Sequence, residues 1–324
     1  MTRTTTIVTV WSAFATPASA WAGPSPLAGD WSFRTPSNEV GWLSVDVSGE
    51  GPPRVQLLWA VGSVRELPSA ELHDGILSFQ FKHRQRMHRV EVRADGDDLH
   101  GVLLAGDGDD RERRQFHGRR QPPLPDAPPL QRMKMGERIR LFNGEDLTGW
   151  KVSNPDKKQG WTVEQGVLKN VTPKTDFGAY GDYTNLQTER EFRDFQLHIE
   201  FRVPANGNSG IYLRGMYEAQ VVDKDSMMQG IHGPGAIFGR IKPSVNAGLP
   251  GGQWQSYDLT LVARHITVVL NNELVIDRQP VRGPTGGAIV ADVTKPGPIY
   301  LQGDHTAVEF RNILLTPIEL QPDP

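Results

Sequence analysis

The sequence has no cysteine among its 324 residues. This absence excludes disulfide bonds, thiolate metal sites and a cysteine nucleophile. It does not fix the compartment, because many exported bacterial proteins have no disulfide. The net charge is only −3, so the chain as a whole has no strong attraction to nucleic acid or to an anionic membrane surface. Beyond the first residues, no apolar stretch is long enough to span a membrane.

Glycine and proline are abundant, with 34 and 25 residues, as expected for many short strands joined by turns. The chain is 37% hydrophobic and 23% charged, which is ordinary for a soluble globular protein. Its length predicts about two domains. We find no internal repeat.

Residues 1–22 have the pattern of an export signal. Arg3 supplies a positive charge, an apolar run extends from Ile7 to Ala15, and Ala18-Ser19-Ala20 is a small-x-small cleavage pattern. We therefore predict a protein exported to the periplasm or out of the cell. The alternative is a disordered N-terminus, because several Thr and Ser weaken the apolar run.

Residues 27–120 are predicted to form a small antiparallel β domain with a barrel-like shape. Apolar residues alternate with period two in four segments separated by turn formers, namely 42–47, 55–59, 77–81 and 90–92. No helical pattern of useful length interrupts them. Gly29-Asp30-Trp31 followed by such a meander resembles the start of lipocalin-like barrels.

Two basic clusters in this domain, Lys82–Arg89 and Arg111–Arg120, invite a nucleic-acid interpretation. No stacking-aromatic motif accompanies the arginines, however, and six aspartates lie close by: Asp95, Asp97, Asp98, Asp107, Asp109 and Asp110. We interpret the clusters as solvated strand faces and predict no nucleic-acid partner.

Five prolines between Gln121 and Gln131 predict a semi-extended linker, which we place at 121–136. A second β domain follows at 137–320. Residues 195–203 (FQLHIEFRV) alternate strictly between apolar and polar, and 266–277 is predicted to be a hairpin with Asn271-Asn272 at its tip. Roughly 180 residues of strands with few helices imply two packed antiparallel sheets, a sandwich or jelly roll.

Six phrases of this second half carry a family resemblance: LFNGEDLTGW (141–150), WTVEQGVLKN (161–170), FQLHIEFRVPANGNSGIYLRG (195–215), YEAQVVD (217–223), QWQSYDL (253–259) and IYLQGDHTAVEFRNILLTPIEL (299–320). Together they resemble the family of 3-keto-disaccharide hydrolase domains, formerly called domain of unknown function 1080. The resemblance implies a concanavalin-like jelly roll and cleavage of glycosides whose sugar carries a ketone at C3. It does not extend to the N-terminal half, and a fold is inherited more safely than an activity.

Within the resemblance, residues 208–223 (NSGIYLRGMYEAQVVD) place polar side chains along one side of a predicted strand. Tyr212, Arg214, Glu218 and Gln220 share one parity, and apolar residues share the other. If the apolar set packs between the sheets, the polar set points outward, either as a wet surface or as the floor of a sugar site. An exposed aromatic such as Tyr212 suits a sugar ring, which favours a site.

A retaining glycosidase needs two carboxylates close together, but positions 216 and 220, on either side of Glu218, hold Met216 and Gln220. This argues against hydrolysis of an unmodified glycoside. The resemblance implies another route, in which the C3 ketone acidifies the C2 proton, a base removes it, the aglycone leaves from C1 and water adds back. Glu218 is the candidate base, Arg214 would stabilise developing negative charge, and Gln220 would orient a hydroxyl.

The remaining candidates lie far along the chain. The Asp304-His305 pair is typical of a base or a metal ligand, although a loop histidine is more often a surface residue. A Gly-rich loop at 229–239 either covers the site or is a flexible connection. We predict His305 as a catalytic residue and four sugar contacts, of which the last is equally compatible with a core position: Gln302, His232, Asn246 and Trp254.

No contiguous ligand motif predicts a metal. Oxygen ligands at Glu218, Asp223 and Asp304 would suit Ca²⁺, and a His-Asp-Glu set would suit a transition metal, so a divalent cofactor is an open alternative. The rival function is that of a non-catalytic carbohydrate-binding protein on the same fold. A third alternative is an N-terminal domain that mediates attachment, joined to a degenerate enzyme. The sequence predicts no oligomeric state.

Overall fold

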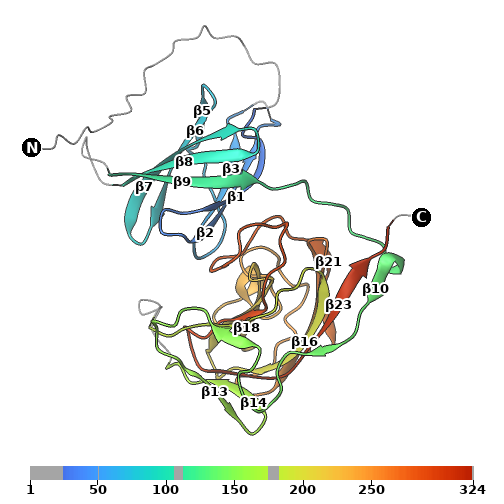
Figure 1. Cartoon of the computed structure of the whole chain (residues 1–324). Coiled ribbons are helices and arrows are strands. Elements are labelled where there is room, and N and C mark those ends of the chain that lie inside the picture. The colour runs from blue at the N-terminus through green and yellow to red at the C-terminus, as the bar shows by residue number, and fades with distance from the viewer. Residues whose placement is uncertain (1–24, 50, 106–111, 174–181, 323–324) are drawn as a thin grey trace, which may run out of the picture.

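The computed structural model describes residues 25–49, 51–105, 112–173 and 182–322. These residues form antiparallel β-sheets and two short 3-10 helices, and no α-helix occurs among them. They gather around two separate hydrophobic cores, one on each side of the proline-rich segment (Figure 1). The all-β fold predicted from the sequence is confirmed.

The predicted export signal at 1–22 lies outside the described residues and stays a prediction. Among the residues that are described, no helix has the length and apolar character needed to cross a membrane.

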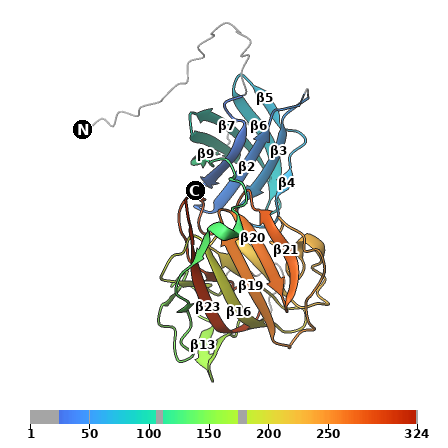
Figure 2. The same cartoon turned by 90° about the vertical axis from the view of Figure 1, so that its right-hand side faces the viewer.

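The N-terminal sheet has nine antiparallel strands in the order β4-β3-β2-β1-β9-β8-β7-β6-β5, which curl around one core (Figure 2). Aromatic rings from different strands meet there, and Gly101 makes room for Phe116, because an added Cβ would lie 2.1 Å from that ring. The strands are β1 (Gly29–Arg34), β2 (Val40–Asp46), β3 (Arg54–Trp59), β4 (Arg65–Glu66), β5 (Glu71–His73), β6 (Ile76–His83), β7 (Arg86–Asp95), β8 (Asp98–Ala105) and β9 (Glu112–Arg120).

The proline-rich segment has no regular structure from 121 to 129 and is followed by η1 (Leu130–Arg132) and β10 (Met133–Met135). Strand β10 already pairs with β23 (Val308–Leu320), with Met133 opposite Leu320. The second β unit therefore begins before the predicted boundary at 137. Arg264 of that unit donates hydrogen bonds to the carbonyls of Pro122 and Pro123, which holds the segment against it.

We expect limited proteolysis with a nonspecific protease to cut first between residues 121 and 132 and to leave a stable C-terminal fragment. This segment exposes backbone that no sheet protects, and each side of it has a core of its own. Mass spectrometry of the fragments gives the cut sites. Early cuts inside β16 (Phe195–Arg202) or β19 (Gln255–Val262), with no surviving fragment, would contradict two separately folding domains.

The C-terminal unit is a sandwich of two antiparallel sheets. The larger sheet has the order β13-β14-β23-β16-β19-β20-β21, with β10 and β11 also paired to β23, and the smaller has the order β12-β15-β22-β17-β18. The other strands are β11 (Ile139–Arg140), β12 (Trp150–Val152), β13 (Trp161–Glu164), β14 (Val167–Asn170), β15 (Leu186–Thr188), β17 (Asn208–Leu213), β18 (Tyr217–Val222), β20 (His265–Leu270), β21 (Glu273–Pro280) and β22 (Tyr300–Leu301), and η2 spans Gly230–His232.

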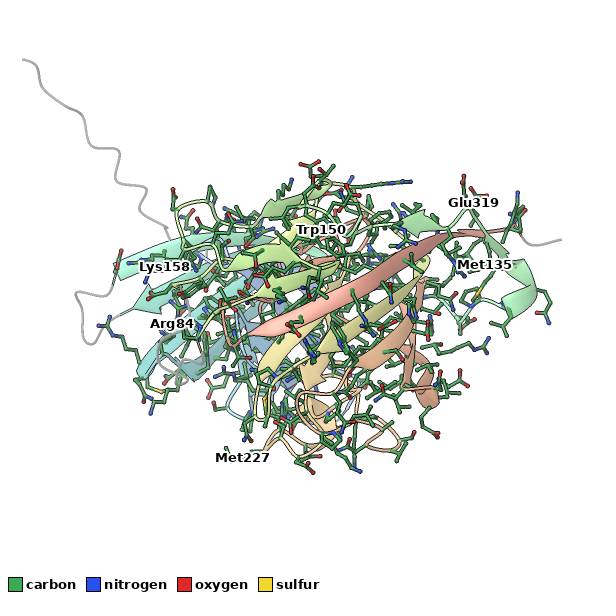
Figure 3. The ribbon with its side chains drawn as sticks, turned by 90° about the horizontal axis from the view of Figure 1, so that it is seen from below. Arg84, Met135, Trp150, Lys158, Met227 and Glu319 are labelled. Atoms are coloured by element: carbon green, nitrogen blue, oxygen red, sulfur yellow. The ribbon has the colours of Figure 1, made fainter. Side chains whose placement is uncertain are left out.

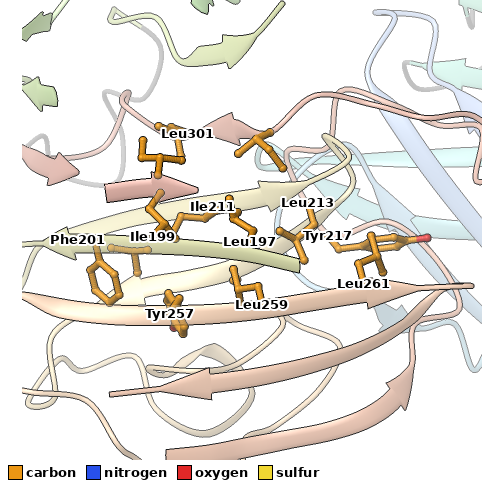
Figure 4. Close-up of a cluster of buried hydrophobic side chains, with 14 of the residues drawn as sticks. Leu197, Ile199, Phe201, Ile211, Leu213, Tyr217, Tyr257, Leu259, Leu261 and Leu301 are labelled. Carbon is orange, nitrogen blue, oxygen red and sulfur yellow. The ribbon is translucent and has the colours of Figure 1, made fainter. Parts of the chain in front are cut away.

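Period-two patterns in the sequence build the core between these sheets. In β16 every second residue is buried, and Leu197 and Ile199 pack toward Ile211 of β17 on the facing sheet (Figure 4). The β20–β21 hairpin turns at Asn271 and Asn272, whose φ angles of 53° and 66° are the positive values that asparagine tolerates. Both features confirm the sequence predictions.

Candidate functional site

Strands β17 and β18 are buried on both faces, unlike most other strands of the sandwich. Ile211 and Ala219 pack in the core between the sheets, and Tyr212 and Glu218 face the other way, as their parity predicts. Two loops, 224–250 and 281–298, cover this outer face. The Tyr212 hydroxyl donates to the Gly286 carbonyl at 2.8 Å, and Nε2 of Gln220 lies 3.6 Å from Sδ of Met228.

The polar face is therefore neither a wet surface nor an open groove. Tyr212 is only 1% exposed, so the expectation of an exposed ring that stacks on a sugar is wrong. The error has a plain physical reason: strand parity tells which face a side chain points to, but it does not tell whether a distant loop covers that face.

Cross-strand pairing sets three polar side chains in a row on this covered face. Tyr212 lies opposite Glu218 on one side and opposite Tyr300 on the other. The two tyrosine rings meet edge to face, with centroids 5.0 Å apart. Gly210 leaves room for the carboxyl group, because an added Cβ there would lie 2.2 Å from Oε1 of Glu218. The row thus ends in a carboxyl group seated over a glycine.

Glu218 is 4% exposed as a residue, and this burial raises the pKa of its carboxyl group from 4.5 to about 8. Contact with the Tyr212 hydroxyl opposes the rise, and the negative charge of Asp304 adds to it. At pH 7 the group is therefore mostly protonated and can donate a hydrogen bond or a proton. The base role of Glu218 stays a prediction, and its raised pKa makes an acid role available beside it.

Asp304 lies close to this row and behaves in the opposite way. Burial acts to raise its pKa, but hydrogen bonds from His305 and Asn185 and the charge of His305 more than offset burial, so its pKa lies below the ordinary value. Its two oxygens lie 2.6 Å from Nδ1 of His305 and 3.3 Å from Nδ2 of Asn185. The site therefore combines one neutral and one ionised carboxyl group, an arrangement that separates acid and base roles.

Two glutamine amides border the row. Nε2 of Gln302 lies 3.5 Å from the Tyr212 hydroxyl, and Nε2 of Gln220 donates to Oδ1 of Asn208 at 3.1 Å. The Oε1 atoms of both glutamines are buried and have no hydrogen-bond partner within the described ranges. An unsatisfied buried acceptor is costly, and a bound hydroxyl group would satisfy it. Both residues remain predicted sugar contacts.

Arg214 does not belong to this site. It lies in the turn between β17 and β18 with φ of 56°, and this turn breaks the strand parity on which its prediction depended. Its guanidinium donates to the carbonyls of Val293, at 2.8 Å, and Lys295. The prediction that Arg214 stabilises charge beside Glu218 is therefore wrong, and the residue instead anchors the 281–298 loop.

Three predicted sugar contacts also lie elsewhere. The guanidinium groups of Arg202 and Arg311, on the outer face of the larger sheet, lie 4.9 and 4.1 Å from the Trp254 ring. Asn246 donates to the Lys224 carbonyl and to Gln229, within the 224–250 loop. His232 belongs to the same loop but bonds to the N-terminal sheet, and burial lowers its pKa. Figure 3 shows Met227 of this loop at the edge of the molecule.

The predicted metal set of Glu218, Asp223 and Asp304 is not brought together. Both carboxylate oxygens of Asp223 accept backbone amides, from Asn206 at 2.6 Å and from Asp225 at 3.0 Å, and so cap a turn. Within the described parts of the chain, no three His, Asp or Glu side chains are grouped so as to hold a metal ion.

Some residues of the site escaped the sequence analysis. Tyr300 has the same parity as Gln302, so the phrase around Asp304 contained a signal for it. Gly210 has the parity of Tyr212 and could have been found in the same way. Asn185 and Thr285, whose hydroxyl accepts the Glu218 amide at 3.1 Å, carry no motif and enter only through tertiary contacts.

Comparison with known proteins finds relatives that match parts of this chain. A segment of 91 residues is 34% identical to the 3-keto-disaccharide hydrolase of Bacteroides thetaiotaomicron, but it covers only 27% of this chain and 30% of that protein. Two crystal structures of proposed glycosyl hydrolases from Parabacteroides distasonis are also similar. One is 21% identical, with 56% of this chain and 94% of that chain covered and a TM-score of 0.46. The other is 29% identical, with 58% and 91% covered and a TM-score of 0.44.

Residues 137–316 match the family described as the 3-keto-alpha-glucoside-1,2-lyase-like domain. This segment holds the smaller sheet, the larger sheet except β10 and the end of β23, and every residue of the buried row. The match extends over more than half of the chain, so the chain belongs to this family, and the membership supports a glycoside hydrolase-like function.

Proposed function

We propose that the covered site of the sandwich cleaves the glycosidic bond of 3-keto-glycosides by elimination and hydration. The observation that carries the proposal is the neutral carboxyl group of Glu218 close to an ionised Asp304 that is bonded to His305. Proton removal at C2 needs a base, and departure of the aglycone from C1 needs an acid. The family match and the 3-keto-disaccharide hydrolase relative support this class of substrate.

The Asp304–His305 pair is the proposed base. Nε2 of His305, whose Nδ1 is bonded to Asp304, takes the proton from C2, and the C–H electrons form an enolate with the C3 ketone. The Tyr300 hydroxyl accepts a hydrogen bond from Asn185, so it donates its own proton to the enolate oxygen. Donors fixed in a water-poor site stabilise such a developing charge strongly.

Glu218 is the proposed acid. As the enolate electrons return to form the C1–C2 double bond, the C1–O bond breaks and the aglycone oxygen takes the Glu218 proton. Water then adds across this double bond: the Glu218 carboxylate takes one of its protons, and the remaining OH bonds to C1. The base, whose proton has exchanged with solvent, returns a proton to C2, which gives the free 3-keto sugar and restores both the acid and the base.

A second candidate is direct hydrolysis of an unmodified glycoside. The sequence argument against it was the lack of a carboxylate beside Glu218, but the fold brings Asp304 close enough for its charge to affect the Glu218 pKa. Against this candidate, both oxygens of Asp304 are already hydrogen-bonded, to His305 and Asn185, which does not suit a nucleophile.

We expect the protein to release the aglycone from a 3-keto-glucoside and not from its unoxidised parent. Substrate deuterated at C2 should lose its label to water and, if deprotonation limits the rate, react more slowly. Mass spectrometry of the product measures the label. Full retention of deuterium with equal cleavage of the parent would show direct hydrolysis, and sugar binding without turnover would show a carbohydrate-binding protein.

A further inference from the structure

The covered site is built in part by the N-terminal sheet. Trp42 of β2 is 1% exposed, yet it belongs to neither hydrophobic core. The guanidinium of Arg240 lies 4.2 Å over its ring, and Gly283 lies against it, because an added Cβ there would come within 2.4 Å of the indole nitrogen. Arg240 belongs to the 224–250 loop and Gly283 to the 281–298 loop, so the Trp42 ring packs against both loops that cover the site.

The turn between β3 and β4, residues 60–63, makes backbone contact with the 281–298 loop. The Gly287 amide donates to the Ala60 carbonyl at 2.9 Å. A Cβ added to Gly286 would lie 2.3 Å from the Gly62 carbonyl oxygen and 2.6 Å from the Gly62 nitrogen. The two segments are therefore in backbone contact, with no room for a side chain at Gly286.

The same turn also contacts the 224–250 loop. Oγ of Ser63 lies 2.5 Å from Nε2 of His232, and a Cβ on Gly239 would lie 3.0 Å from that oxygen. Gly239 has φ of 63°, so it is strained for any other residue as well. One turn of the N-terminal sheet thus touches both covering loops.

Only one stretch of backbone separates this turn from the catalytic row. The Gly286 carbonyl accepts the Tyr212 hydroxyl at 2.8 Å, and the neighbouring Thr285 hydroxyl accepts the Glu218 amide at 3.1 Å. Since Tyr212 has a single hydroxyl proton, its bond to Gly286 competes with the contact to Glu218 that lowers the pKa of that carboxyl group.

We propose that the 60–63 turn of the N-terminal sheet is a positioning element of the active site, which holds Gly286 and thereby the Tyr212 hydroxyl beside Glu218. The N-terminal sheet would then be needed for catalysis and not only for attachment. The effect of this turn on the pH–kcat profile rests on the function proposed above. Its effects on the Glu218 pKa and on hydrogen exchange at Gly287 do not.

Two variants test this in the full-length protein. Trp42→Ala removes the ring that packs against both loops and leaves the two hydrophobic cores intact, because Trp42 belongs to neither. Gly286→Ala places a methyl group against the backbone of Gly62. Both release the Gly286 carbonyl, so it no longer competes for the Tyr212 proton, the contact of Tyr212 with Glu218 strengthens, and water can approach the carboxyl group. The Glu218 pKa should therefore fall by about one unit, and the alkaline limb of the pH–kcat profile should move down equally. Hydrogen exchange at Gly287 should accelerate, on the order of tenfold.

Matched controls are Met87→Ala, on the same sheet and 58% exposed, and Gly51→Ala, where an added Cβ meets nothing within 4 Å. Both should leave every readout unchanged. Substrate-free ¹³C NMR of the Glu218 carboxyl, assigned by its loss in Glu218→Gln, reads the pKa without turnover. If wild type lacks 3-keto activity but Trp42→Ala still shifts this pKa and the exchange, the proposed function fails and the positioning role stands. If Trp42→Ala and Gly286→Ala leave both unchanged, the positioning role is wrong.

Discussion

Glu218→Gln should lower kcat for a 3-keto-glucoside by roughly 10² or more and leave the fold intact, because it keeps the shape of the side chain but removes the proton donor. A glutamine can still donate a hydrogen bond from its amide, so substrate binding and KM should change less than kcat. Steady-state kinetics of aglycone release measure both values.

Glu200→Gln is the matched control. Glu200 is also a strand carboxylate of the sandwich, but it lies on the outer face of the larger sheet, where it accepts hydrogen bonds from Arg311 and Asn312 at 2.6 Å each. The same chemical change there should leave kcat within about twofold, since surface ion pairs contribute little. An equal loss of kcat in both variants, or no loss in Glu218→Gln, would remove Glu218 from the proposed role.

The acid role also gives the pH dependence a sign. Turnover should be retained toward lower pH for as long as the Asp304–His305 pair can accept a proton, and it should be lost as pH rises through about 8, where Glu218 ionises.

Local patterns in the sequence predicted the parts of the molecule that local physics decides. The alternation in residues 195–203 identified β16 because a strand at a core must bury every second side chain. The same reasoning placed Tyr212 and Glu218 on the outer face of their hairpin. Parity could not predict the register that sets Tyr212 opposite Tyr300, because β22 is distant in sequence from β17.

The two loops that cover this face explain why the prediction of an exposed Tyr212 was wrong. Regular periodicity predicts neither loop, and it is the covering that raises the pKa of Glu218. The prediction for Arg214 was wrong for another reason: its positive φ in a tight turn reverses the strand parity locally. The prediction for Trp254 was wrong because an aromatic ring that packs on two arginines has no distinctive spacing in the sequence.

The free energy of unfolding should carry the signature of the buried carboxyl group. Folded Glu218 keeps its proton up to about pH 8, whereas the unfolded chain loses it near the ordinary value of 4.5. Its protonation therefore stabilises the fold fully below about pH 4.5, and that stability is lost as pH rises through about 8. Glu218→Gln has no proton to lose, so its stability relative to wild type should rise between pH 5 and 8, by an amount on the order of a few kcal/mol. Urea unfolding at pH 5, 6.5 and 8 measures this difference.

In Glu200 burial is outweighed by bonds from Asn312 and Arg311, which lower the pKa, so Glu200→Gln should change relative stability only toward acid pH. A Glu218→Gln curve parallel to wild type from pH 5 to 8 would mean that the carboxyl group is solvated, and a solvated carboxylate is not the neutral acid that the proposed elimination needs.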